Sequence, residues 1–188
     1  GATLVAVEPV AGMRRTFVEA VPDVPIVAGL AEAMPFRDGS LHAVTVAQAF
    51  HWFDAHKALR ELHRVIRPGG GLGLVWNIRD GEATELARGF SELFDEYRRD
   101  VPAWRDRGWE PAFRDTELFT SPRTETFDHV QEMTPEVFLD RALSVSFIAA
   151  LPPAEQQTVR DRVLALVPAG ATTVSLPYRC EVSWCERR

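Results

Sequence analysis

The sequence predicts an α/β protein whose core is a doubly wound, mostly parallel β-sheet that ends in a C-terminal antiparallel strand pair. Short apolar strands alternate with amphipathic helices over residues 1–80, and this order requires crossovers that place helices on both faces of a parallel sheet. The strands are nearly continuous apolar runs, as expected for strands buried on both faces. The chain of 188 residues is 46% hydrophobic and 26% charged, which is typical of one globular domain with a core.

Strands and helices alternate through the first part of the chain. The predicted strands are short and rich in β-branched residues, and they cover 3–7, 26–28, 41–47 and 72–76. The predicted helices repeat apolar residues every three or four positions, and they cover 10–21 and 58–66. Pro22 ends the first helix, and the Pro-Gly-Gly-Gly run at 68–71 ends the second.

The second part of the chain is predicted to be mainly helical. Helices are expected over 86–97, 135–143 and 153–167, and strands over 124–130 and 172–184. Thr134 followed by Pro135 is a typical helix start. We therefore divide a single domain, 1–188, into an α/β half over 1–80, a lid-like helical insertion over 81–122, and C-terminal strands and helices over 123–188.

Composition limits the classes of partner. The net charge of -6 and the pI near 5.4 argue against nucleic acid, because binding phosphate backbones requires a basic face. No apolar run reaches the roughly 18 to 20 residues that cross a bilayer, and no secretory leader opens the chain, so we expect a cytoplasmic protein without a membrane partner. Cys180 and Cys185 are predicted to be ordinary thiols, and no metal site is expected.

Glu8 is the first candidate site residue, because it ends the first predicted strand. Ligands of open α/β sheets bind outside the carboxyl ends of the strands, where an acid can accept hydrogen bonds from the two ribose hydroxyls of a nucleotide. A solvated acid at the end of a strand is the alternative interpretation of the same residue.

Five motifs follow one another in a recognisable order. They are the valine-rich strand that ends at Glu8, Ala-Glu-Ala-Met-Pro-Phe at 31–36, Asp-Gly-Ser-Leu at 38–41, Ala-Gln-Ala-Phe-His-Trp-Phe at 47–53, and Arg-Pro-Gly-Gly at 67–70. Each motif is weak alone, but together they resemble the small-molecule class I S-adenosylmethionine-dependent methyltransferases, especially the trans-aconitate methyltransferase-like branch. The resemblance covers residues 1 to about 80. It implies a Rossmann-like fold, S-adenosylmethionine as the cofactor, and a small-molecule acceptor.

The resemblance also implies which residues bind the cofactor, and it makes 1–80 the cofactor-binding half. Glu8 matches the acid that binds the ribose, and Leu30, Ala31 and Glu32 match the loop around the adenine. Leu30 stands where the family most often has Asp, so recognition of the adenine amino group is expected to pass to Glu32 or to a backbone carbonyl. Ala47 and Gln48 match the strand end beside the methionine part of the cofactor. Glu32 has an alternative role as a helix-start acid.

The substrate pocket is predicted from the segments that follow two strands. His51 and Trp52 match positions at the mouth of the pocket, and His51 is the best-placed general base if the acceptor is a hydroxyl or a carbon acid. A carboxylate acceptor needs no base, and Arg79 is then the candidate cationic clamp. The cluster 50–53 has the alternative role of packing the helix that follows it.

A glycine-rich loop after a central first strand is the main family feature that the sequence lacks. That strand would lie between the strands that contain 4–7 and 43–46, and the glycine run 69–73 does not replace the loop, because it enters a strand instead of leaving one. We therefore expect either additional chain before Gly1 or a catalytically inactive remnant.

Two other functions compete with methyl transfer. An acid that closes a strand also serves a nicotinamide-dependent oxidoreductase. A non-catalytic, methyltransferase-like module that binds a partner through its helices is the alternative from another class. Aromatic residues of the insertion suit an apolar substrate, a dimer surface or a plain core, and they are Phe90, Phe94, Tyr97, Trp104 and Trp109. The chain is expected to be a monomer or a homodimer.

Overall fold

The computed structural model describes residues 1–98 and 107–188. They belong to two compact units. Unit 1 comprises 1–75, 103–124 and 182–188, and unit 2 comprises 76–102 and 125–181. Trp104, one of the predicted insertion aromatics, lies outside the described residues.

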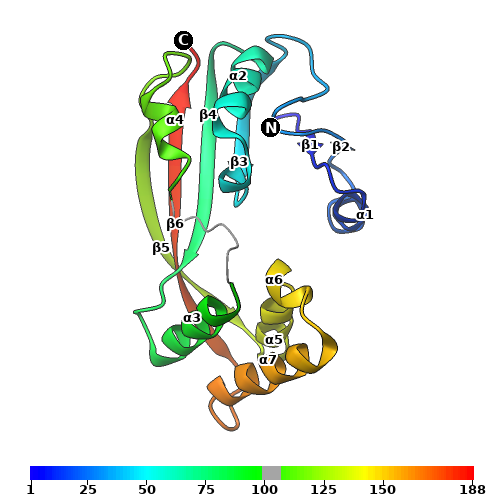
Figure 1. The fold of residues 1–188 in the computed structure, drawn as a ribbon, viewed down its shortest axis with the longest axis vertical. Helices are drawn as coiled ribbons and strands as arrows, with labels where there is room; N and C mark the ends of the chain where they lie inside the picture. Colours follow the sequence, from blue (N-terminus) through cyan, green and yellow to red (C-terminus); the bar gives the residue numbers. More distant parts are fainter. Residues whose placement is uncertain (99–106) are drawn as a thin grey trace. The chain divides into compact units, whose positions relative to one another are not determined.

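The strands form two sheets (Figure 1). In the first sheet, β1 (Ala6–Val7) and β2 (Ile26–Val27) are parallel. The second sheet has the order β3-β4-β6-β5, and its strands are β3 (Leu41–Ala47), β4 (Ile66–Arg79), β6 (Val174–Glu186) and β5 (Arg123–Met133). In the described part of the chain, β1 pairs only with β2, and β3 only with β4. The two sheets are therefore not joined by hydrogen-bonded strands among the described residues.

Strand direction confirms the predicted α/β class. β3 and β4 are parallel, with Leu41 opposite Ile66 and Ala47 opposite Val75. Backbone hydrogen bonds connect Gly70 with Arg187 and Asp80 with Pro177, so β4 and β6 run in opposite directions. Side-chain hydrogen bonds between Thr124 and Ser183 and between Glu132 and Ser175 show the same for β5 and β6. The antiparallel pair at the C-terminal end is thus present, as predicted.

The strand β4 is longer than the sequence predicts. Strand structure was expected only over 72–76, after a glycine-rich turn, whereas β4 begins at Ile66 directly after a helix. The glycine run lies within the sheet because Gly70 passes close to its neighbours: a Cβ atom there would lie 2.6 Å from the carbonyl oxygen of His42. Glycine is required at this position by a close backbone approach.

The helices of unit 1 differ in how many of their side chains are buried. α2 (Ala55–Val65) buries its apolar face, and the Asp54 side chain accepts a hydrogen bond from the Lys57 amide at its start. α1 (Ala11–Ala20) forms where the sequence predicts a helix, but none of its residues is buried, and Met13 and Val18 are exposed. α4 (Glu110–Arg114) is a short helix that the apolar pattern did not predict. The larger buried side chains of unit 1 include Phe50, Leu59, Leu62, Ile66, Leu72, Leu74 and Phe119.

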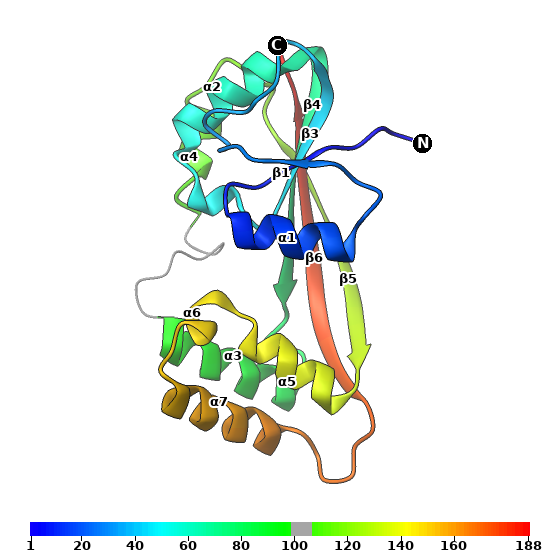
Figure 2. The same cartoon turned by 90° about the vertical axis from the view of Figure 1, so that its right-hand side faces the viewer.

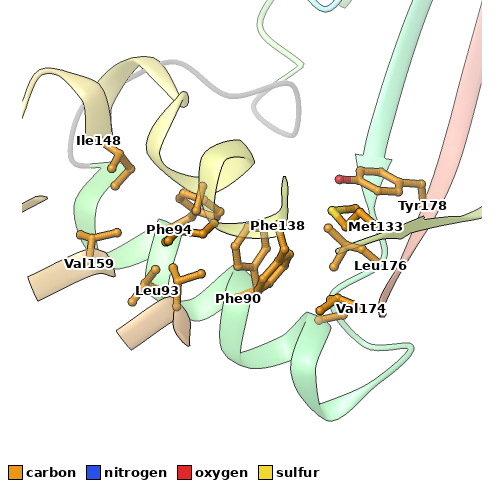
Figure 3. Close-up of a cluster of buried hydrophobic side chains, with 14 residues drawn as sticks. Phe90, Leu93, Phe94, Met133, Phe138, Ile148, Val159, Val174, Leu176 and Tyr178 are labelled. Atoms are coloured by element: carbon orange, nitrogen blue, oxygen red, sulfur yellow. The ribbon is translucent and has the colours of Figure 1, made fainter. Parts of the chain in front are cut away.

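Unit 2 has a core of helices and strands. α3 (Glu85–Arg98), α5 (Pro135–Leu143) and α7 (Pro153–Leu166) lie side by side, with the short α6 (Ser146–Ala149) beside them (Figure 2). The Thr134 hydroxyl accepts a hydrogen bond from the Val137 amide, so the predicted helix start is confirmed. Labelled core residues in Figure 3 include Phe90, Phe94, Phe138, Leu176 and Tyr178.

The predicted insertion aromatics that the structure describes are mostly core residues. Phe90 and Phe94 are fully buried in unit 2, with ring centroids 4.5 Å apart, and Tyr97 packs against the same core. Trp109 is buried in unit 1, where its ring contacts Phe50. The core alternative therefore holds for these residues.

The cysteines and the helix lengths bear on two further expectations, ordinary thiols and the absence of a membrane span. Cys180 and Cys185 are free cysteines, and Cys185 is buried. None of the helices in 1–98 and 107–188 combines the length and the apolar character that spanning a bilayer requires.

Candidate functional site

Glu8 follows β1 and is held by local hydrogen bonds. Its amide donates to the Val27 carbonyl at 3.1 Å, which continues the parallel pairing with β2. Its side-chain Oε1 accepts from the Val10 amide at 2.8 Å, and Arg14 donates to its main-chain carbonyl at 2.8 Å. The carboxylate is thereby fixed at the carboxyl end of the strand. Its Oε2 has no hydrogen bond in the described part of the chain.

The segment Leu30–Glu32 follows β2 and is anchored at one end. Leu30 forms an isolated bridge with Ala33, and its side chain is 54% exposed. Oε1 of Glu32 accepts a hydrogen bond of 2.9 Å from the amide of Asp54, the residue that caps α2. Glu32 itself lies in a turn and not at the start of a helix of its own, but its carboxylate contacts the residue that caps α2. Ala31 lies between Leu30 and Glu32 in this segment.

An ion pair on α2 holds the rest of this loop. Glu61 Oε1 accepts from the Met34 amide at 2.6 Å, and Arg64 donates to the Phe36 carbonyl at 2.8 Å and to the Met34 carbonyl at 3.1 Å. Arg64 also pairs with Glu61 and Asp38, each at 2.6 Å. The Arg64 hydrogen bond is the main reason that the pKa of Glu61 is lowered. We call Glu61 and Arg64 the loop clamp.

Gln48 has the most unusual backbone of the predicted site residues. It directly follows β3 and has a φ of 55°, in the left-handed region that side chains other than glycine rarely adopt. Its amide donates to the Val75 carbonyl at 2.9 Å, which ties this turn to β4. Ala47, the last residue of β3, lies opposite Val75 in the sheet and is exposed. A turn at the carboxyl end of a parallel strand is thus held in a strained conformation.

The aromatic segment after Gln48 forms a 3-10 turn, η1 (Phe50–Trp52). Phe50 is fully buried, and its ring lies 5.5 Å from Phe53, 5.9 Å from Trp109 and 5.4 Å from Phe113. His51 is partly buried, whereas Trp52 is 54% exposed; their ring centroids are 5.2 Å apart. Phe50 therefore anchors the turn through Phe53, Trp109 and Phe113, and the two residues beside it remain near the surface.

Arg79 lies at the end of β4 and belongs to unit 2, whereas the other predicted site residues belong to unit 1. Its guanidinium carbon lies 4.4 Å from the ring centroid of Phe94 and 5.1 Å from that of Phe90. Burial lowers the pKa of Arg79 to about 10, and the charges of Arg141 and Arg98 act in the same direction. The group is a partly buried cation on an aromatic surface.

Several residues near these sites were not singled out from the sequence. The loop clamp could have been found from the sequence, because Glu61 and Arg64 are an acid and a base at i, i+3 spacing on a predicted helix. Arg141 and Tyr178 carry no such signal, because they lie 37 positions apart in the sequence and only the fold brings them into hydrogen-bond contact. In the described ranges 1–98 and 107–188, no group of three or more His, Cys, Asp and Glu side chains is arranged to hold a metal ion.

Comparison with known proteins agrees with this architecture. The family model described as a methyltransferase domain matches residues 1–74. An uncharacterized methyltransferase of Mycobacterium tuberculosis is 37% identical over 183 residues, which are 95% of this chain and 72% of that protein. The chain therefore belongs to the methyltransferase family, and it is an enzyme of that family.

More distant relatives support the fold. An uncharacterized methyltransferase-like protein of Schizosaccharomyces pombe is 35% identical over 150 residues, 78% of this chain and 58% of that protein. A solved structure from Anaeromyxobacter dehalogenans, described as a proposed type II methyltransferase, is similar with a TM-score of 0.66 and 20% identity over 96% of this chain and 78% of that one. The fold is therefore the Rossmann-like fold of methyltransferases.

Proposed function

We propose that the chain transfers a methyl group from S-adenosylmethionine to an oxygen atom of a small-molecule acceptor. The observation that carries the proposal is the left-handed backbone of Gln48, with its φ of 55°, at the carboxyl end of β3. Strained residues of this kind persist where the surrounding structure fixes them, and they concentrate at functional sites. In open α/β sheets, that end of the strands is also where ligands bind.

The residues of unit 1 fit the nucleoside half of the cofactor. Glu8 is oriented by the Val10 amide through one oxygen, and its other oxygen is suited to accept hydrogen bonds from ribose hydroxyls. Leu30 offers an exposed apolar side chain for a flat base, and Ala31 offers its backbone groups. We assign the adenine amino group to a backbone carbonyl of this loop or to the second oxygen of Glu32, because the first one binds the Asp54 amide.

The chemistry that the cofactor supplies is a methyl group on a sulfonium, which is a good leaving group. What the chain itself contributes is therefore mainly orientation and the exclusion of water. The backbone of Ala47 and Gln48 is proposed to lie beside the reacting end, with Trp52 as a wall of the acceptor site.

His51 is proposed as the general base for an acceptor that must lose a proton. It is partly buried beside Trp52 on a turn that Phe50 anchors, and imidazole accepts protons near neutral pH. An acceptor that is already ionised would not need this group. His51→Gln should then leave the rate unchanged for a carboxylate acceptor and lower it about 100-fold for a hydroxyl acceptor.

Isothermal titration with S-adenosylhomocysteine tests the proposal directly. We expect Glu8→Gln to weaken binding by at least about 10-fold, because one charged hydrogen-bond acceptor is lost. Glu19→Gln is the matched control, since Glu19 is an exposed acid on α1 and should leave the affinity unchanged.

The affinity of a ligand that lacks the ribose 2′-hydroxyl tests the ribose contact separately from the rest of the ligand. The 2′-deoxy form of 5′-methylthioadenosine should bind more weakly than 5′-methylthioadenosine to the natural chain but equally well to Glu8→Gln. Equal affinity of all three proteins for S-adenosylhomocysteine would contradict the role of Glu8. Absence of binding would favour the alternative of a non-catalytic module.

A further inference from the structure

The strand β5 is the outermost strand of the four-stranded sheet, because the strand order is β3-β4-β6-β5 (Figure 2). In the described part of the chain, no strand pairs with the outer edge of β5. Residues 123–130 are all exposed, so neither face of this stretch is covered by a helix. The backbone groups along such an edge are able to hydrogen-bond to a strand of another molecule.

Two features by which proteins commonly block an exposed edge are absent from the part of β5 that lies in unit 2. Residues 125–133 contain neither proline nor lysine. The pairing with β6 also shows no bulge here: Thr124 contacts Ser183 and Asp128 contacts Arg179, so the two strands advance by the same number of residues. The outer edge is therefore regular and open to a pairing strand.

Charged side chains are a further means of protecting an edge, and β5 has three acids in unit 2. Two of them are bound by β6. Asp128 accepts a hydrogen bond of 3.1 Å from Arg179, and Glu132 accepts one of 2.8 Å from Ser175. Glu125 forms no ion pair in the described part of the chain, so it is the acid of β5 whose charge a pairing strand has to balance.

The sequence of β5 is complementary to itself when two copies pair antiparallel about Phe127. A two-fold axis perpendicular to the sheet places Phe127, which is 54% exposed, opposite Phe127 of the second copy, and aromatic pairs are favourable between strands. Glu125 then lies opposite His129 of the second copy, which joins an acid to a group that can carry a positive charge. Thr126 lies opposite Asp128, and its hydroxyl can donate to that carboxylate.

The neighbouring registers lack this match. The axis keeps each side chain on its own face of the sheet, so it has to pass through a residue. An axis through Asp128 would set two carboxylates against each other, and like charges directly opposite are destabilising. An axis through Thr126 would place Glu125 opposite the ring of Phe127, without a cation. The charges therefore favour the register that is centred on Phe127.

His129 is oriented by contacts within unit 2. Its ring stacks on Tyr178 at a centroid distance of 5.4 Å, and its Nε2 hydrogen-bonds with Oδ1 of Asn77 at 2.8 Å. This contact occupies Nε2, so Nδ1 is the ring nitrogen that can donate to the Glu125 carboxylate of a second copy when the imidazole is protonated. The partner of Glu125 is thus held in place before the strands pair.

We infer that β5 is the interface of a homodimer in which two copies pair antiparallel through residues 125–129, with Phe127 on the two-fold axis. Of the two oligomeric states expected from the sequence, this interface selects the homodimer. A two-fold contact between identical surfaces closes at two copies, so the association stops there. The inference is independent of the proposed methyl transfer, because it uses neither the cofactor segments nor a substrate.

Sedimentation equilibrium of the full 188-residue chain measures the association directly. We expect a monomer–dimer equilibrium without larger species. Phe127→Asp sets two carboxylates against each other at the axis and should weaken dimerisation at least about 10-fold. Val137→Asp is the matched control, because Val137 is an apolar residue of unit 2 on α5 that is 50% exposed, and its replacement should leave the dimerisation constant unchanged.

Cysteine cross-linking tests the register of the two strands. In a Cys180→Ser background, Phe127→Cys should form a disulfide between two copies on mild oxidation, because residues at the axis have Cβ atoms about 4.5–5.5 Å apart. The Cys180→Ser change prevents a bond to Cys180, which follows Arg179 on the neighbouring strand. Val130→Cys is the control in the same background: Val130 is also 54% exposed, but its two copies would lie about 20 Å apart along the strands.

Three results would overturn the inference. They are a chain that stays monomeric at every concentration, equal dimerisation constants for Phe127→Asp and Val137→Asp, and cross-linking of Val130→Cys as fast as that of Phe127→Cys. Because Phe127 is exposed, Phe127→Asp should fold like the natural chain, which its circular dichroism spectrum checks. Should this variant fail to fold, the ratio of the two cross-linking rates decides the question.

Discussion

Gln48 shows how a single residue can connect backbone strain with function. It holds a φ of 55° while its amide bonds to Val75 at 2.9 Å, so the turn is fixed by β4. A left-handed conformation costs a side-chain-bearing residue about 1–2 kcal/mol. Glycine has no such penalty, whereas a β-branched residue has a larger one.

Replacement of Gln48 tests this strain. Gln48→Val should lower the free energy of unfolding by about 1–2 kcal/mol more than Gln48→Gly does, as measured by urea denaturation. If the backbone is what serves the cofactor, Gln48→Gly should also keep the affinity for S-adenosylhomocysteine. Equal stability of the two variants would show that the conformation is not retained in solution.

Cys185 is a second residue whose surroundings decide its chemistry. Burial raises its pKa to about 12 from the ordinary value of 9.0. Folding therefore favours the thiol, and this contribution to stability is complete below the unfolded pKa and is lost as the pH rises from there through the folded value. The thiolate is the form that reacts.

Alkylation of the two cysteines should accordingly differ. We expect iodoacetamide at mildly alkaline pH to modify Cys180, which is partly exposed, much faster than Cys185, which is buried. Peptide mass spectrometry after short exposures gives both rates, and a urea-unfolded sample gives the intrinsic rates as the control. Equal rates in the folded chain would contradict the burial of Cys185.

At the scale of elements, the loop clamp determines how the predicted adenine loop is held. Glu61 is mostly buried and binds both the Met34 amide and Arg64. Removing it leaves the Met34 amide without its acceptor and leaves Arg64 with Asp38 as its ion-pair partner. Glu61→Ala should therefore lower the free energy of unfolding by about 1–3 kcal/mol in urea denaturation. Glu96→Ala, which removes an exposed ion pair between α3 and α7, is the matched control and should have little effect.

The pH dependence of this difference follows from the pKa of Glu61. Because that pKa is lowered from 4.5 in the folded chain, the carboxylate contributes stability above the unfolded pKa, and the contribution is lost as the pH falls through the folded value. The natural chain and Glu61→Ala should therefore become more similar in stability under acidic conditions. A constant difference across this range would contradict the clamp.

Elements that depend on local sequence were predictable, and long-range ones were not. The helix that begins after Thr134 could be predicted because its cap and its proline are adjacent in the sequence. The start of β4 at Ile66 could not, because it depends on the pairing of Ile66 with Leu41, which lies far away in the sequence. In the same way, the Glu32 contact with Asp54 requires the folded loop.

The candidate site was predictable to a similar extent. Glu8 was selected because it ends a predicted strand, and Gln48 because it matches a family position; in the structure each directly follows a strand, and the strain of Gln48 is additional information. Arg79 was selected for its position after the predicted strand over 72–76, but its aromatic surroundings come from α3. The partnership of Arg141 with Tyr178 became visible only in the structure.

At the scale of the whole molecule, the family and the fold agree. The chain belongs to the methyltransferases and covers 72% of its mycobacterial relative. Its sheets keep the strand directions of that fold, parallel in β1-β2 and β3-β4 and antiparallel at β5 and β6. The cofactor role is proposed for three strand-end segments in unit 1, near Glu8, Leu30–Glu32 and Ala47–Gln48.

Hydrogen exchange measured with and without S-adenosylhomocysteine tests most directly whether these three segments act as one site. We expect slower exchange of the backbone amides near Glu8, in the loop around Leu30–Glu32 and at Ala47–Gln48, because bound ligand shields and stabilises all three. Peptides from α7 should be unchanged and serve as the internal control. Binding that leaves these three segments unprotected, or protects only the helices of unit 2, would contradict the account.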